Sequence, residues 1–180
     1  MTQEVSGFTL LQRALHWLMA VCILAMLFIG VGMVSTIRPK YIELVAIHKP
    51  LGLAILVLVL IRIVVRIRCG APALPAAMPA PMKAVASLSH VALYALMIAL
   101  PLLGWAMLSA ARFPVFVLGT RLPWIAPHSD ALHTVLWDAH RFLALCFFAL
   151  IVGHVGAALY HALIRRDGVF EAMTSNRRSH

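Results

Sequence analysis

Residues 132–164 read LHTVLWDAHRFLALCFFALIVGHVGAALYHALI, an apolar run long enough for a helix to cross a bilayer. Its four histidines are separated by seven or fourteen positions: His133, His140, His154 and His161. Because a multiple of seven residues drifts only about 20° per heptad around a helix, these rings project from nearly the same stripe. At about 1.5 Å per residue, His140 and His154 are about 21 Å apart along the axis. One helix therefore presents imidazoles near both faces of a membrane.

The composition of the chain is that of a membrane protein. Of its 180 residues, 63% are hydrophobic and 12% are charged, whereas about 25% are charged in an average soluble protein. Long apolar runs bounded by charge, proline or glycine predict four membrane-spanning helices, near residues 13–34, 46–66, 83–110 and 132–164. We predict an all-α integral membrane protein, a four-transmembrane-helix bundle that forms a single domain over residues 1–180.

The positive charges indicate how the bundle is oriented. Lys and Arg are enriched on the cytoplasmic side of membrane proteins, most reliably in short loops. Arg62, Arg66 and Arg68 close the second predicted helix, and Lys83 opens the third. We therefore expect a multi-pass protein with this loop and both termini in the cytoplasm. The net charge of +9 suits contact with anionic lipid head groups of the bilayer, and we expect no nucleic-acid partner.

This topology matches two histidines of the fourth helix with histidines of other helices at the same depth. His16 lies about one turn into the first predicted helix from the cytoplasmic end, and it is matched there with His154 of the fourth. His48 opens the second predicted helix at the outer end, level with His140. A lone histidine can simply hydrogen-bond across a helix interface, but ionisable residues inside a membrane usually mark a site. Paired histidines on facing helices are a common way for bundles to hold a metal or a haem.

Two imidazoles at each level suit the two axial positions of a porphyrin iron. A structural zinc site needs four grouped ligands, usually including cysteine, and Cys22, Cys69 and Cys146 show no such spacing. No Cys-x-x-Cys-His sequence is present for covalent haem attachment. We therefore expect a bundle that encloses two b-type haems. Glycines offer room for the macrocycles, although small residues also serve helix packing; they are Gly30, Gly32, Gly52, Gly104 and Gly153.

Over essentially its whole length, the chain resembles the prokaryotic dihaem cytochrome b561 family, which includes membrane superoxide oxidase. The matching motifs are Arg13-Ala-Leu-His16-Trp17, Ile47-His48-Lys49, Trp137-Asp-Ala-His140, and Gly153-His154 with His161. The resemblance implies a bacterial inner-membrane protein and assigns the axial ligands: His16 with His154 for the inner haem, and His48 with His140 for the outer haem. His90 and His161 correspond to two family histidines that are not ligands, and we treat them as a candidate ubiquinone site.

By the same resemblance, the expected activity is that of a superoxide oxidase, a superoxide:ubiquinone oxidoreductase. Electrons would pass from superoxide at the periplasmic face through two b haems to ubiquinone. Basic residues at the outer end are candidates for steering the superoxide anion, although they are equally suited to be ordinary interface charges: Arg38, Lys40, Lys49, Arg112, Arg121 and Arg141. One alternative is a cytochrome b membrane subunit that relays electrons between quinone and a soluble dehydrogenase partner. Another is a proton or metal transporter without haem.

Overall fold

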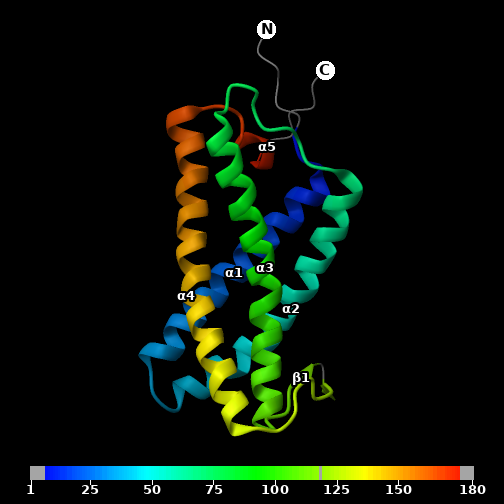
Figure 1. Cartoon of the computed structure of the whole chain (residues 1–180), viewed down its shortest axis with the longest axis vertical. Helices are drawn as coiled ribbons and strands as arrows, with labels where there is room; N and C mark the ends of the chain where they lie inside the picture. Colours follow the sequence, from blue (N-terminus) through cyan, green and yellow to red (C-terminus); the bar gives the residue numbers. More distant parts are fainter. Residues whose placement is uncertain (1–6, 118, 175–180) are drawn as a thin grey trace.

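The structure, a computed structural model, describes residues 7–117 and 119–174. It consists mainly of four long helices (Figure 1): α1 (Leu10–Ser35), α2 (Lys40–Cys69), α3 (Ala80–Ala110) and α4 (Asp130–Tyr160). A π-helical turn, η1 (His161–Arg165), continues α4, and the short α5 (Glu171–Thr174) follows. Each of the four long helices is long and apolar enough to cross a membrane, so the predicted four-span bundle is confirmed.

The observed helices begin earlier than the hydropathy pattern predicts, and α2 differs most. It begins at Lys40 rather than near residue 46. Its first turn is polar, with Lys40 and Glu43 forming an exposed ion pair at 3.8 Å, so no apolar run marks it. As a consequence His48 lies two turns inside α2 and not at its start.

Local signals explain where the other helices begin. At α1, Thr9 and Gln12 form a capping box, in which the Thr9 hydroxyl accepts the Gln12 backbone N–H and the Gln12 side chain accepts the Thr9 backbone N–H. The Ser129 hydroxyl accepts the backbone N–H of Leu132 and caps α4. Proline occupies the first turn of α3, where its missing N–H costs no helical hydrogen bond.

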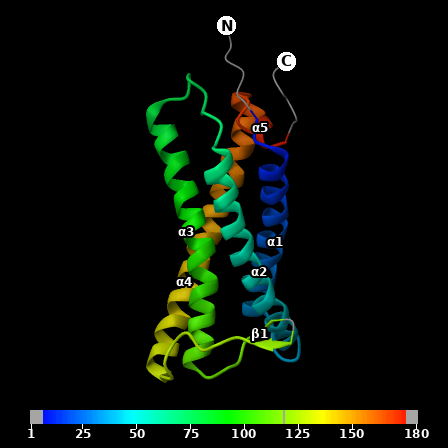
Figure 2. The same ribbon diagram turned by 90° about the vertical axis from the view of Figure 1, so that its right-hand side faces the viewer.

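The helices are arranged as two hairpins. Helix α1 packs along α2 and α3 packs along α4, while α2 and α3 contact each other more sparsely. Figures 1 and 2 show the two pairs side by side in perpendicular views. The core where they meet is apolar and draws on all four helices: Met19, Val59, Met97, Phe147 and Ile151. Outward-facing residues such as Phe28 and Val34 are about four-fifths exposed, as expected of side chains that face lipid.

The two ends of the bundle differ. At one end, here called the α5 end, backbone and side-chain hydrogen bonds join the chain before α1 to α5: Phe8 N–H donates to the Ala172 carbonyl, and the Trp17 indole donates to the Met173 carbonyl. At the other, the hairpin end, the α3–α4 connector forms a small antiparallel pair, β1 (Phe116–Val117) with β2 (Thr120–Arg121).

Candidate functional site

Four histidines meet in two pairs, one toward each end of the bundle. His16 of α1 faces His154 of α4 at the α5 end, with ring centroids 6.4 Å apart and ring planes at 70°. His48 of α2 faces His140 of α4 toward the hairpin end, with centroids 6.1 Å apart and planes at 68°. These are the two pairs that the topology predicted. Phe147, midway between His140 and His154 along α4, belongs to the apolar core that separates the pairs.

The spacing of each pair fits two ligands on opposite sides of one metal ion. If each metal–nitrogen bond is about 2.0–2.1 Å, as in zinc sites, the ring centres lie about 6.4 Å apart, because a ring nitrogen is about 1.15 Å from its centre. Rings that share a coordination axis can adopt any angle between their planes. Within residues 7–117 and 119–174, no three metal-binding side chains are grouped to hold a bare metal ion. By their spacing, the two pairs could each hold a haem iron between two imidazoles.

His140 is held in one orientation by α3. Its Nδ1 lies 3.1 Å from the carbonyl oxygen of Leu100. Because a carbonyl only accepts, Nδ1 carries the proton in this hydrogen bond, and Nε2 of a neutral ring is left with its lone pair available. A Cβ added at Gly104 would meet the ring at 3.5 Å, so Gly104 gives the imidazole its place against α3.

His48 has a buried ring nitrogen that lacks a partner. Its Nδ1 is sealed from solvent and makes no hydrogen bond within the described part of the chain. Leaving a buried polar atom unsatisfied costs about 1–3 kcal/mol, so the ring is expected to gain a bond when its cofactor is present. This observation also supports the assignment of a prosthetic group to this level.

The five glycines expected to make room for a macrocycle divide into three groups. Gly32 lies against Leu44 and Gly52 against Met26, so both serve the packing of α1 on α2. Gly104 lies against the His140 ring and leaves room for it beside α3. A Cβ at Gly30 or Gly153 would meet nothing within 4 Å, so no neighbouring side chain requires a glycine at either position.

His90 joins the pair at the α5 end. Its ring lies 5.6 Å from that of His154, and its Nδ1 is 2.6 Å from the Ala86 carbonyl. Nearby, Arg62 Nε donates to the Tyr94 hydroxyl at 2.9 Å. The predicted partner of His90 in a quinone site, His161, lies elsewhere at this end and contacts Asp167. Among the described residues, no hydrogen bond or ring contact joins His90 to His161.

The six basic residues proposed for anion steering all lie toward the hairpin end but not in one cluster. Arg38 and Lys40 are exposed at the start of α2, where Lys40 pairs with Glu43. Lys49 follows His48, and Arg141 follows His140. Arg112 and Arg121 share an open cleft of about 520 Å³, whose other lining residues are Ser109, Trp124, Ala126, Pro127 and His128.

The cleft has features that the sequence did not reveal. The Arg121 guanidinium lies over the Trp124 ring, 4.5 Å from its centroid. Nδ1 of His128 is 2.8 Å from the Ala110 carbonyl, which ties the cleft to the end of α3. Because Arg112 and Arg121 are nine positions apart, only the fold of the connector brings them together.

Comparison with known proteins identifies relatives that cover nearly the whole chain. Residues 7–176 match the family described as prokaryotic cytochrome b561. The chain is 28% identical over 183 residues to cytochrome b561 homolog 1 of Escherichia coli (strain K12), with 97% of this chain and 100% of that protein aligned. It is 28% identical over 178 residues to the probable superoxide oxidase CybB of Yersinia pestis, covering 95% and 97% of the two chains. Cytochrome b561 homolog 2 of Escherichia coli (strain K12) is 27% identical over 176 residues, covering 96% and 93%.

Proposed function

This chain belongs to the prokaryotic cytochrome b561 family of haem-binding membrane electron-transfer proteins, and we propose that it is a superoxide:ubiquinone oxidoreductase with two b haems. The observation that carries the proposal is the pair of facing histidines at each level, with ring centroids 6.4 Å and 6.1 Å apart. His16 with His154 would hold one haem and His48 with His140 the other. Bound there, the haems supply reversible one-electron transfer across the membrane.

The orientation follows from charge. Arg62, Arg66, Arg68 and Lys83 lie at the α5 end, around the α2–α3 loop. The positive-inside rule therefore favours the α5 end as cytoplasmic and the hairpin end as periplasmic, in the inner membrane of a bacterium. The proposal that both termini are cytoplasmic accords with this orientation, although residues 1–6 and 175–180 lie outside the described residues.

Superoxide would be oxidised at the hairpin end. Arg112 and Arg121 present two guanidinium groups to one open cleft, and clustered positive charge raises the encounter rate of a small anion. The reaction requires no acid or base there, because loss of one electron converts superoxide to dioxygen without breaking a bond. The relative of Yersinia pestis, named as a probable superoxide oxidase, favours this substrate.

Ubiquinone would be reduced at the α5 end. Each quinone needs two electrons and two protons, so its carbonyl oxygens require hydrogen-bond donors. His90 and His161 are the candidate donors on α3 and on the turn that follows α4. The indole of Trp17 is already committed, because it donates to the Met173 carbonyl.

The experiment that tests the proposal is stopped-flow mixing of the oxidised, purified holoprotein with superoxide, with and without a soluble ubiquinone analogue. Superoxide should reduce the haems rapidly, and quinone should reoxidise them. Inertness toward superoxide, together with rapid reduction by quinol, would refute the oxidase and favour the alternative, a cytochrome b subunit that relays electrons to a soluble dehydrogenase. A colourless protein that binds no haem would refute both.

Variants connect this test to particular residues. His48→Ala and His140→Ala should each abolish the same haem and block reduction by superoxide, while the haem of His16 and His154 stays bound. Two haems per chain after either change would contradict the pairing. Arg112→Gln with Arg121→Gln should slow haem reduction by superoxide roughly 3–10-fold at low ionic strength, and less in high salt. Arg68→Gln, which removes an exposed charge at the α5 end, is the matched control.

A further inference from the structure

The chain turns back on itself directly after α4. His161 begins the π-helical turn η1, and Arg166, with a left-handed backbone at φ 50°, ends it. The Arg166 N–H donates to the His161 carbonyl at 2.7 Å, and Gly168 adopts φ 82°. Two positive φ angles so close together reverse the chain abruptly, and Gly is the residue that adopts them at least cost. The reversal brings Asp167 back against His161.

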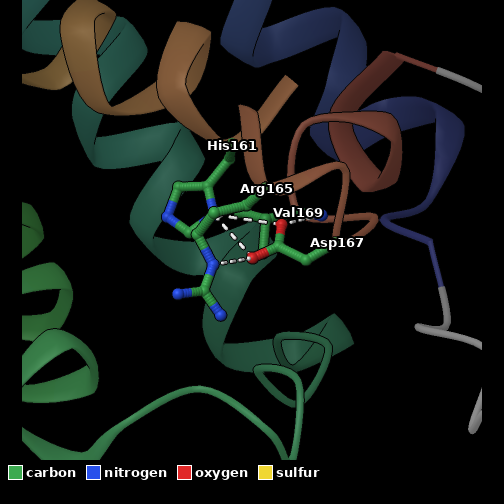
Figure 3. Close-up of polar contacts among 4 residues, drawn as sticks. All are labelled: His161, Arg165, Asp167 and Val169. Carbon is green, nitrogen blue, oxygen red and sulfur yellow. Dashed lines mark hydrogen bonds and ion pairs between the residues drawn. The ribbon is translucent and has the colours of Figure 1, made fainter. Parts of the chain in front are cut away.

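Asp167 makes a dense set of contacts with its surroundings (Figure 3). Nδ1 of His161 lies 2.8 Å from Oδ2 and 3.0 Å from Oδ1 of Asp167. Arg165 Nε donates to the same Oδ2 at 2.9 Å, and the Val169 N–H donates to Oδ1 at 3.4 Å. His161 is only 9% exposed, so the imidazole is shielded from bulk water.

This geometry fixes the protonation pattern of the pair. Burial alone would raise the pKa of Asp167, but hydrogen bonds from His161 and Arg165 outweigh it and lower the pKa below its usual value. The carboxylate is therefore ionised near neutral pH and can only accept hydrogen bonds. It follows that Nδ1 of His161 carries a proton, which leaves Nε2 to exchange protons with another molecule.

The second nitrogen of His161 is free for that exchange. Among the described residues Nε2 makes no hydrogen bond, because both bonds of the ring run from Nδ1 to Asp167. Figure 3 shows it on the side of the ring that points away from Asp167. A clamp that served only to fix the end of α4 would not need an imidazole with an open nitrogen.

We propose that Asp167 is a positioning residue: it keeps a proton on Nδ1 of His161 and orients the ring, so that Nε2, when it is also protonated, donates that second proton to a quinone at the α5 end. This inference rests on the proposed quinone reduction. Two electrons arrive from the donor oxidised at the hairpin end, and two protons complete the conversion of quinone to quinol. In each transfer the Nε2–H bond breaks and a quinone O–H bond forms. Water at the α5 end then reprotonates Nε2, while Asp167 remains a carboxylate throughout.

Four other charged groups at the α5 end can influence how the rate of quinone reduction depends on pH. Arg165 lies on the same turn, Glu171 belongs to α5, Arg13 is buried in α1, and Arg66 lies near the end of α2. All four remain in place in an Asp167 variant. A difference between its pH profile and that of the natural protein therefore reports on the pair itself.

The first test measures quinone-dependent reoxidation of the pre-reduced holoprotein in Asp167→Asn, Asp167→Glu and the control Asp130→Asn, an exposed carboxylate at the start of α4. Asp167→Asn should slow reoxidation on the order of 10–100-fold, the range expected when a general acid is impaired, and should change the pH profile of the rate. Reduction by superoxide and haem content should not change. Asp167→Glu should recover most of the rate, and Asp130→Asn should match the natural protein.

The second test is the ¹⁵N spectrum of histidine-labelled protein, with His161 assigned through His161→Gln. The neutral ring should carry its proton on Nδ1 in the natural protein and lose that preference in Asp167→Asn. Arg165→Lys keeps the charge and the carboxylate, so it should retain the rate, whereas a purely structural clamp predicts losses like those of Asp167→Asn. If Asp167→Asn fails to fold, Asp167→Glu and Arg165→Lys carry the test.

The two proposals fail in distinguishable ways. Loss of reoxidation in His161→Gln but not in Asp167→Asn, or an unchanged tautomer in Asp167→Asn, would overturn the role of Asp167 and leave quinone reduction standing. Absence of quinone-dependent reoxidation in the natural protein would overturn the proposed function, and the proton-donor role with it.

Discussion

Gly104 should respond in opposite ways to two substitutions that differ by two methyl groups. A Cβ at this position would lie 3.5 Å from Cε1 and 3.7 Å from Nδ1 of His140, which is ordinary van der Waals contact. Gly104→Ala should therefore keep every haem and gain about 0.5–1 kcal/mol of stability, because glycine is the poorer helix former. Valine adds carbons about 1.5 Å further out, and in a helix its χ1 has one strongly preferred rotamer.

The valine should consequently displace the His140 ring by up to about 1.5 Å, which far exceeds the tolerance of about 0.2 Å in a metal–ligand distance. It should also break the 3.1 Å hydrogen bond to Leu100. If two haems are bound as proposed, half of the haem should be lost, measured as haem per chain and by difference spectroscopy. Gly156→Val, at an exposed glycine with nothing within 4 Å, is the control. A fully loaded Gly104→Val protein with an unchanged spectrum would refute the placement of His140 as a ligand held against α3.

Two further predictions concern the α5 end. Hydrogen bonds depress the pKa of Asp167 in the folded state, so the stability that this carboxylate contributes is present above its unfolded pKa and is lost as pH falls through its folded pKa. The difference in melting temperature between the natural protein and Asp167→Asn should therefore shrink on acidification below about pH 4. A difference that stays constant would contradict this prediction. Gln12→Ala removes both the capping-box hydrogen bond to Thr9 and the 2.7 Å hydrogen bond to the Gly70 carbonyl. It should therefore lower the free energy of unfolding by about 1–2 kcal/mol, measured by thermal unfolding. The control Thr174→Ala removes one long, exposed hydrogen bond and should lower it little.

The membrane spans and the depths of the histidines could be predicted because each follows from distances along one chain. Hydropathy located the four helices, and the helical rise placed His140 and His154 about 21 Å apart. The structure brings His16 to His154 and His48 to His140, although the role of these residues as ligands stays a prediction. Hydropathy failed at the start of α2, because a polar first turn resembles a loop.

Features that depend on how helices are rotated against one another could not be predicted. Nothing in the spacing of His90 indicates that its ring lies 5.6 Å from His154, because that contact is set by the packing of α3 on α4. The contact between His161 and Asp167 depends on a π-helical turn and on the left-handed backbone of Arg166, a residue with no special preference for it. The common cleft of Arg112 and Arg121 likewise arises from a connector whose strands are only two residues long.

The division of the bundle into two hairpins has a consequence for how the protein matures. Helix α4 supplies one histidine to each level, and the partners come from α1 and α2 in the opposite hairpin. A ligand that binds only the folded state adds its binding free energy to stability. Haem binding at the two histidine pairs would therefore stabilise the contact between the α1–α2 and α3–α4 hairpins at two levels of the bundle. In a newly inserted chain without haem, the two hairpins would be joined only by the apolar core around Val59 and Phe147, a difference from the finished protein that membrane proteases could recognise.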